Sequence, residues 1–214
     1  MVVETTGRRD RNMREKRDRI FAAAAELFAE RGFEAVTTGE IADRADVAAG
    51  TVFRYASSKS ELLLMVYNET FRAAIAEGER RAAGRADVVD AVLALVAPVV
   101  TGAAERAENS IVYQRELLFG APTEQYRSEG LALVARLEEA IAAHLVRAAT
   151  ARGTSPDAEG ARSAADSVFA ATHLAVARLS TGAHHGRDVL DDLRRQIALV
   201  VAGFLVLAAG LDDT

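Results

Sequence analysis

Apolar residues recur at every third or fourth position through most of the chain, which is the spacing of amphipathic helices. No segment shows the sustained alternation of apolar and polar residues that marks a strand. The pattern therefore predicts an all-α protein. The first helix is predicted over residues 11–31, before Gly32, and its apolar stripe consists of Ile20, Ala23, Ala24, Leu27 and Phe28.

Short breaks rich in glycine, proline or histidine divide the rest of the pattern, which predicts about nine helices in all. Two short helices, beginning near residues 38 and 49, follow the first one. Six longer helices are predicted over 59–81, 87–100 with an interruption near Pro98, 104–119, 123–152 with Thr123 as its cap, 157–181, and 187–210 after the connection 182–186.

The short helix at residue 38 begins with a capping box. The Thr37 hydroxyl can accept a hydrogen bond from the backbone N–H of Glu40, and the Glu40 carboxylate can accept one from the backbone N–H of Thr37. Asp46 tolerates the turn geometry needed to end this helix. A second box, formed by Ser58 and Glu61, predicts the start of the long helix at residue 59.

The segment between the two boxes has two different faces. Residues 48–50 are small, so their backbone can approach another surface closely. Val52 and Ala56 are four positions apart and are predicted to face inward. Two short helices joined by a tight turn indicate a helix-turn-helix, whose second helix enters the major groove of DNA. The outward side chains that suit this groove are Thr51, Arg54 and Tyr55.

At these residues the chain resembles the TetR family of transcriptional regulators. IFAAAAELFAERGFEAVT, residues 20–37, is similar to the family's first helix, and VAAGTVFRYASSKSELL, residues 47–63, is similar to its recognition helix and the start of its fourth helix. The resemblance covers roughly residues 17–66. The family often has a phosphate-binding tyrosine where this chain has Phe53, and phenylalanine where it has Ala56.

The resemblance implies nine helices in two domains. Residues 1–62 would form the three-helix DNA-binding domain with its basic arm, and residues 63–214 a larger ligand-binding and dimerisation domain. A chain of 214 residues is long enough for both, since domains commonly hold about 100–150 residues. The resemblance also implies a mechanism. A small molecule in the second domain shifts the fourth helix, which changes the spacing of the two DNA-binding domains of a dimer and lowers its affinity for the operator.

The net charge of −5 is unevenly distributed along the chain, because the N-terminal part is basic and the rest is acidic. Residues 8–19 hold seven basic and three acidic side chains, a net charge of +4, against −9 for the remainder. A basic arm before the first helix can follow a phosphate backbone or enter the minor groove. The alternative is a solvated terminus that contacts nothing.

The predicted DNA contacts fall into two groups. Phosphates are predicted to be bound by Thr38, by Lys59 and by the backbone N–H groups near Ala49 and Gly50, which sets the register on the duplex. Bases are predicted to be read by Thr51 and Arg54, because arginine can bind O6 and N7 of guanine. Tyr55 is predicted to contact either a phosphate or a thymine methyl.

The last two predicted helices are long, antiparallel across a short connection, and rich in small and aliphatic residues. Their apolar surface exceeds what one domain's core should need, which predicts a four-helix bundle with a second copy of the chain. Such a homodimer would bind an inverted-repeat operator in double-stranded DNA, with half-sites about 34–36 Å apart or multiples of that. The predicted interface residues are Leu174, Arg178, Ile197, Val200, Val201, Phe204 and Leu207.

An effector site is inferred from this architecture and not from a motif. The helices between residues 62 and 180 carry large apolar side chains with sparse polar groups, as ligand pockets do, although each aromatic taken singly is better explained as core. Few of these side chains are charged, which favours a neutral or mostly hydrophobic small-molecule effector. The predicted pocket residues are Tyr67, Phe71, Asn109, Tyr113, Gln114, Phe119, Tyr126, His144, Phe169 and His173.

Other classes of protein have less support in the sequence. The chain has no cysteine, which excludes disulfides, cysteine-ligated zinc and a thiol nucleophile. No nucleophile-elbow or metal-binding pattern occurs, and His184 and His185 lie in a predicted loop, so no catalytic residue, metal or cofactor is predicted. A non-specific DNA-coating protein and, with less support, a helical enzyme remain the alternatives.

The sequence also predicts a cytoplasmic protein without membrane contact. The polar N-terminus lacks the apolar stretch of a secretory signal. The longest apolar run, Ile197–Leu211, has 15 residues. A bilayer crossing needs about 20, so this run is predicted to be a helix buried in a subunit interface.

Overall fold

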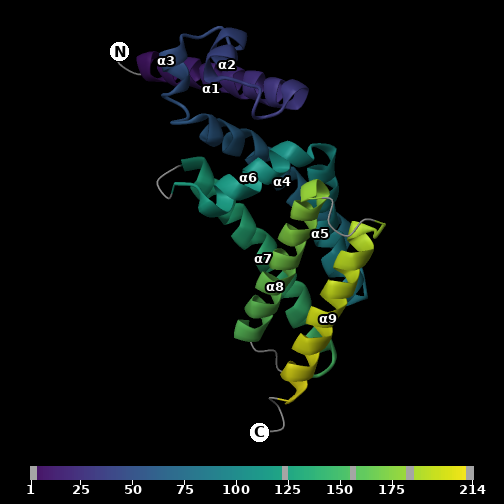
Figure 1. Cartoon of the computed structure of the whole chain (residues 1–214). Helices are drawn as coiled ribbons and strands as arrows, with labels where there is room; N and C mark the ends of the chain where they lie inside the picture. Colours follow the sequence, from purple (N-terminus) through teal and green to yellow (C-terminus); the bar gives the residue numbers. More distant parts are fainter. Residues whose placement is uncertain (1–3, 122–124, 155–157, 182–185, 211–214) are drawn as a thin grey trace. The chain divides into compact units, whose positions relative to one another are not determined.

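The structure, a computed structural model, describes the chain except for residues 1–3, 122–124, 155–157, 182–185 and 211–214. The described residues form nine α-helices, which confirms the predicted fold class and number of helices. They are α1 (Glu4–Arg31), α2 (Thr38–Arg44), α3 (Ala49–Val52), α4 (Lys59–Ala82), α5 (Val88–Glu105), α6 (Ala107–Phe119), α7 (Gln125–Ala151), α8 (Ala158–Thr181) and α9 (Val189–Gly210) (Figure 1).

The chain divides into two compact units. The first unit comprises Met1–Glu69 together with Val112–Gly130, and the second comprises Thr70–Ile111 together with Leu131–Thr214. Helices α4, α6 and α7 each contribute residues to both units. The first unit thus contains the predicted DNA-binding domain, and in addition the end of α6 and the start of α7, which the sequence assigns to the second domain.

The apolar stripe of α1 forms part of the core of the first unit. Ile20 and Ala24 are fully buried, and the Phe28 ring packs with its centroid 5.7 Å from that of Phe33. Burying a large apolar side chain contributes about 1.5–3 kcal/mol. These contacts fix α1 as the scaffold on which α2 and α3 are held.

Helix α1 begins seven residues earlier than predicted. The sequence predicts a basic arm before residue 11, whereas the structure has α-helix from Glu4 onward. The segment 4–19 contains no proline and six arginines, a residue that favours helix. The basic residues 8–19 are therefore part of a helix and do not form an extended arm.

In the second unit, α5, α8 and α9 pack against one another, and α8 and α9 lie antiparallel side by side (Figure 1). The sequence predicts an interruption of α5 near Pro98, but the helix continues through this residue to Glu105. A proline inside a helix costs about 3 kcal/mol, because one hydrogen bond is lost and the ring crowds the preceding turn. Burial of Leu95, Val96 and Val100 around it offsets this cost.

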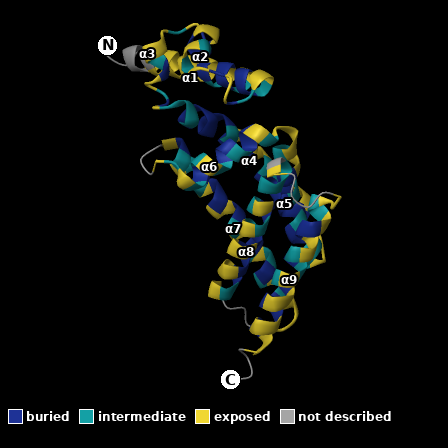
Figure 2. Cartoon of the chain, viewed as in Figure 1, coloured by how far each residue is buried: buried dark blue, intermediate teal, exposed yellow. Residues whose placement is uncertain are grey.

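Two helices of the second unit, α5 and α9, are long and apolar enough to cross a membrane by length and composition alone. Each packs against the other and against α8; α5 has buried and half-buried positions over most of its length, and α9 alternates between buried and exposed positions (Figure 2). Core helices of helical domains have the same properties. The longest uninterrupted apolar run in the sequence overlaps α9 and ends at residue 211. Run length alone therefore does not identify α5 as an apolar helix.

Several sequence predictions concern residues outside the described part of the chain. These are the cap at Thr123 and the loop histidines His184 and His185.

Candidate nucleic-acid interface

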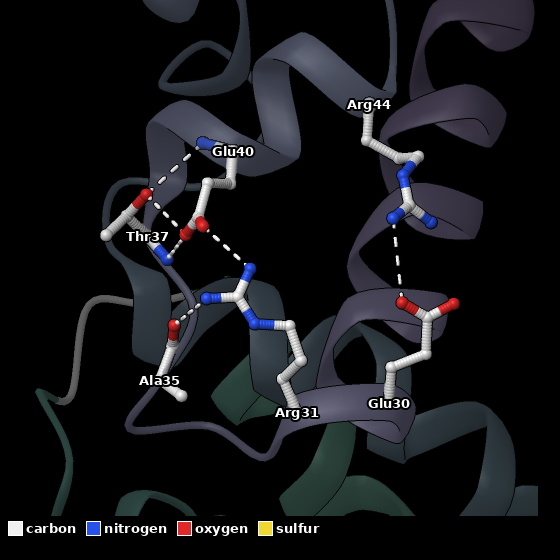
Figure 3. A network of polar contacts seen from close by, with 6 residues as sticks. All are labelled: Glu30, Arg31, Ala35, Thr37, Glu40 and Arg44. Carbon is white, nitrogen blue, oxygen red and sulfur yellow. Dashed lines mark hydrogen bonds and ion pairs between the residues drawn. The ribbon is translucent and has the colours of Figure 1, made fainter.

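The N-terminus of α2 has the predicted capping box, shown in Figure 3. The Thr37 Oγ1 accepts from the Glu40 N–H at 3.2 Å, and the Glu40 Oε2 accepts from the Thr37 N–H at 2.8 Å. Arg31 donates to the other carboxylate oxygen of Glu40 at 2.7 Å and to the Ala35 carbonyl at 2.8 Å. The hydrogen bond from Arg31, followed by those from Thr37, lowers the pKa of Glu40 from 4.5 to about 2.

A second set of charges connects α2 to α1. Arg44 near the end of α2 pairs with Glu26 at 3.1 Å and with Glu30 at 3.5 Å (Figure 3 draws the Glu30 pair). These side chains are exposed, and such pairs contribute about 0–1 kcal/mol each. They fix the direction of α2 on α1 more than they stabilise the unit.

The turn after α2 is made at Asp46, as predicted, and this residue has the left-handed conformation, with a φ of 52°. The Asp46 N–H donates to the Asp43 carbonyl at 3.1 Å, and the Val47 N–H donates to the Ala42 carbonyl at 3.0 Å. This pair of bonds is a Schellman motif, which satisfies the last carbonyls of a helix. The motif ends α2 abruptly and starts the chain toward α3.

Residues 48–56, which we call the reading segment, consist of α3 and a further helical turn. The α-helix itself covers four residues, Ala49–Val52. The N–H groups of Tyr55 and Ala56 then both donate to the Val52 carbonyl, at 2.9 and 3.1 Å. Val52 and Ala56 are buried, as predicted, and hold the reading segment on the unit's core.

The opposite face of the reading segment is open to solvent. Ala49, Gly50, Phe53 and Arg54 are exposed, and Thr51 is half-buried. The Arg54 guanidinium has no hydrogen-bond or ion-pair partner in the described part of the chain. On this face another molecule can approach the backbone closely, and the Arg54 guanidinium is available to bind it.

Two of the predicted DNA contacts have partners inside the chain. The Tyr55 hydroxyl donates to the Met13 carbonyl of α1 at 3.1 Å. A hydrogen bond donated to a phosphate would need the same proton, so the structure does not support that contact for Tyr55. The Lys59 Nζ donates to the Phe33 carbonyl at 2.9 Å and lies 4.2 Å from the centre of the Phe33 ring. A phosphate contact by Lys59 therefore stays a prediction, as does one by the half-buried Thr38 at the start of α2.

The start of α4 has the predicted cap, and its glutamate makes further hydrogen bonds. The Ser58 Oγ accepts from the Glu61 N–H at 3.0 Å, as expected. The buried Glu61 carboxylate also accepts from the N–H of Ser57 at 2.5 Å and from that of Gln125 at 3.1 Å. The second contact joins the N-terminus of α4 to the N-terminus of α7 within the first unit.

Two turns further along α4, Asn68 forms a buried polar network. It accepts from the Tyr113 hydroxyl of α6 at 2.8 Å and donates to the Tyr126 carbonyl of α7 at 2.8 Å. Burial raises the pKa of the Tyr126 phenol, and nearby Arg17 of α1 partly offsets this rise. Asn68 was not predicted as a site residue, since an isolated asparagine in a helical stripe gives no signal of its partners.

The ten predicted pocket residues are divided between the units. Tyr67, Tyr113, Gln114, Phe119 and Tyr126 belong to the first unit, and the other five to the second. Within the first unit, the Tyr67 and Tyr113 rings lie 5.8 Å apart. Phe119 is 82% exposed at the end of α6, which corrects its assignment as a pocket wall.

In the second unit, Phe169 and His173 lie one helical turn apart on α8, with ring centres separated by 5.7 Å. Burial lowers the pKa of His173, and also that of His144 on α7, where Arg147 adds to the effect. Both imidazoles therefore favour the neutral form. Phe71 and Asn109 are buried. The assignment of these residues to a ligand pocket stays a prediction.

The predicted dimer-interface residues also separate into two groups. Ile197 and Val201 are buried inside a single chain, so they are core residues and their assignment to the interface is corrected, whereas Phe204 is 6% exposed and lines the groove described below. Leu174 and Leu207 are 49% and 71% exposed, whereas Arg178 and Val200 are half-buried. An apolar helix has two sides that sequence alone does not distinguish.

A shallow groove with a volume of about 870 Å³ follows the outer side of α8 and α9. Its α8 wall is made of small residues, and its α9 wall combines glycines and buried residues with the exposed aliphatic side chains of Leu199, Val206 and Leu207. The lining residues are Gly160, Ser163, Ala164, Ser167, Leu199, Val200, Gly203, Phe204, Val206, Leu207, Ala208 and Gly210.

Known proteins share both the reading segment and the fold. Residues 20–66 match the family model described as bacterial regulatory proteins, tetR family. The chain is similar to the crystal structure of Thermus thermophilus FadR, a TetR family transcriptional repressor in complex with lauroyl-CoA, with a TM-score of 0.66 and 27% identity, over 88% of this chain and 95% of that one. The chain therefore resembles the tetR family of bacterial regulatory proteins, by sequence over residues 20–66 and by fold over most of its length.

Curated members of the family match over shorter stretches. The transcriptional repressor KstR of Mycobacterium tuberculosis is 42% identical over 69 residues, which is 32% of this chain and 31% of KstR. The transcriptional activator FasR of Mycolicibacterium smegmatis is 44% identical over 52 residues, 24% of each protein. The matches thus span less than a third of these relatives' length. The family resemblance seen in the sequence is confirmed.

Proposed function

We propose that the protein is a sequence-specific DNA-binding regulator of transcription, in the first instance a repressor, that acts in the cytoplasm. The observation that carries the proposal is the exposed face of the reading segment. Its backbone is unobstructed at Ala49 and Gly50, and the Arg54 guanidinium beside them is free to bind guanine. The capping box and the Schellman motif hold this face rigidly on α1 and α2, as base reading requires.

Two copies of the chain would bind an inverted-repeat operator. A single short reading segment makes few base contacts, whereas two related by two-fold symmetry double them. The groove on α8 and α9, with Leu207 and Val206 each 71% exposed beside it, supports dimerisation through this side. Burying such a strip against its copy removes apolar area from water.

A small and mostly hydrophobic effector would release the operator. FadR of Thermus thermophilus, the 27% identical relative, was solved with lauroyl-CoA, and we propose that the effector of this chain likewise has a long apolar part. Buried Phe71 in the second unit, with His144 and His173 favouring the neutral form, supports a site without strong charge. To lower the affinity for DNA, such a molecule must bind one arrangement of the dimer's two DNA-binding domains better than the other.

The experiment that tests the proposal starts from purified protein and sheared genomic DNA. Sequencing the retained fragments should reveal an inverted repeat, and titration against random competitor DNA should show a clear preference for it. Retention of all fragments alike would indicate a non-specific coating protein, and no retention would favour an enzyme. Light scattering of the same sample should give the mass of a dimer, and a monomer on the operator would contradict the proposed symmetry.

A further inference from the structure

Phe53 is the largest apolar side chain exposed on the reading segment. It directly follows α3 as the C-cap residue, and 52% of its surface is exposed. The neighbouring Val52 is fully buried and Ala56 is 2% exposed, so the core beneath the segment closes without the phenyl ring. Packing inside the chain therefore does not account for an aromatic residue at this position.

The surroundings of Phe53 leave its ring prominent. Ala49 and Gly50 precede it by four and three positions, so helical geometry places them on the same face. Both are exposed, and a Cβ added to Gly50 would meet no atom within 4 Å. The backbone can thus approach a partner closely while the phenyl ring projects beyond it, next to the free Arg54.

We propose that the Phe53 ring packs against the 5-methyl group of one thymine in each operator half-site. This inference rests on the proposed DNA-binding function and adds a specificity-determining residue to it. A phenyl ring has no atom that can hydrogen-bond to a phosphate or to the polar edge of a base. Thymine is the base that presents an apolar group, its methyl, in the major groove.

The deoxyribose of the backbone offers a second apolar surface to such a ring. Contact with a sugar does not depend on the base that the sugar carries, whereas contact with the methyl group does. The two can therefore be separated by changing the methyl group alone.

The test uses the full chain and the operator recovered from genomic DNA. Each thymine of a half-site is replaced in turn by deoxyuridine, which lacks the 5-methyl group and still pairs with adenine. With wild-type protein, replacing one particular thymine of a half-site should lower the affinity for the operator about fourfold, which is the effect expected for losing one buried methyl group. Replacements at the other thymines should leave binding unchanged.

Variants at Phe53 assign this effect to the ring. Phe53→Ala should bind the thymine and deoxyuridine operators equally, while Phe53→Tyr, which keeps the ring, should still distinguish them. Because the side chain lies outside the core, Phe53→Ala should retain the wild-type circular dichroism and its affinity for random DNA.

Three results would overturn the inference while leaving the proposed function intact. One is an operator preference in the wild type with no methyl dependence at any thymine, and a second is a methyl dependence that survives in Phe53→Ala. The third is an equal loss of affinity for operator and random DNA in Phe53→Ala, which would assign the ring to a sugar. A wild-type protein with no sequence preference would overturn the inference and the proposed function together.

Discussion

Tyr55 at the end of the reading segment donates its hydroxyl proton to the backbone carbonyl of Met13 in α1, over a distance of 3.1 Å. The bond joins the reading segment to the basic N-terminal part of α1. We expect Tyr55→Phe to lower the free energy of unfolding by about 0.5–1.5 kcal/mol, the usual contribution of one hydrogen bond, as measured by urea denaturation.

The same variant also decides between two roles of the hydroxyl. If its partner is Met13, affinity for random DNA should change less than about twofold, since no phosphate contact is lost. Unchanged stability with a large fall in random-DNA affinity would instead show that the hydroxyl binds a phosphate.

The Glu40 carboxylate makes the start of α2 sensitive to acid. Its pKa is lowered from 4.5 to about 2 in the folded chain, so the unfolded chain binds the proton more readily. The stability that this carboxylate adds is therefore fully present above pH 4.5 and is lost as the pH falls from 4.5 through 2. Carbon-13 NMR of the carboxyl group should show a midpoint near 2.

The variant Arg31→Ala tests whether Arg31 is the cause of the low pKa of Glu40. Removing the strongest hydrogen bond to Glu40 should raise its midpoint toward 4.5, while the bonds from Thr37 keep it somewhat lower. A midpoint near 4.5 already in the wild type would show that the arginine does not hold the carboxylate in solution.

The buried Asn68 network should be important for stability of the first unit. Asn68→Ala removes the hydrogen bonds to the Tyr113 hydroxyl and to the Tyr126 carbonyl, and each lost bond costs about 0.5–1.5 kcal/mol. Tyr113→Phe removes one bond and should cost less. Because the two residues share a bond, the double variant should lose less than the sum of the single losses.

Asn12→Ala on the exposed part of α1 is the control for that series and should leave the unfolding free energy nearly unchanged. Additive losses for Asn68 and Tyr113 would mean that the hydrogen bond between them is absent in solution.

Gly78 allows α4 and α5 to approach to backbone contact in the second unit. A Cβ at this position would lie 2.1 Å from the Leu95 carbonyl oxygen, so the helices must separate to admit it. We expect Gly78→Ala to destabilise the protein by about 1–3 kcal/mol. Gly102→Ala is the matched control, because a Cβ there meets no atom within 4 Å and alanine favours helix by about 0.5–1 kcal/mol. Equal melting temperatures of the two variants would contradict the close approach.

Features set by neighbouring residues were predictable from the sequence. The box of Thr37 and Glu40, the turn at Asp46 and the buried pair Val52 and Ala56 depend on residues within a few positions of one another. Because their geometry follows from local chemistry, the amino-acid sequence is enough to predict the helix-turn-helix, whereas of the side chains predicted to face outward Arg54 is exposed and Thr51 and Tyr55 are half-buried.

Contacts between distant residues were not predictable. The partners of Tyr55 and Lys59 lie 42 and 26 positions away, and Asn68 reaches 58 positions to Tyr126. For the same reason the border between the units could not be placed from the sequence, since residues 112–130 join the first unit through contacts of this kind. Which apolar residues of α9 face its own core also depends on packing that the sequence does not encode locally.

The central claim is that the reading segment recognises base sequence, and affinity titrations of Arg54→Ala test it most directly. Wild type and variant are compared on the recovered operator and on random duplex at one salt concentration, since affinity depends strongly on salt. We predict that operator affinity falls by about tenfold or more, as expected for losing an arginine to guanine contact worth about 1–3 kcal/mol in each half-site, while random-DNA affinity changes less than about threefold. Equal losses on the two duplexes would contradict the claim, because Arg54 would then bind only the backbone.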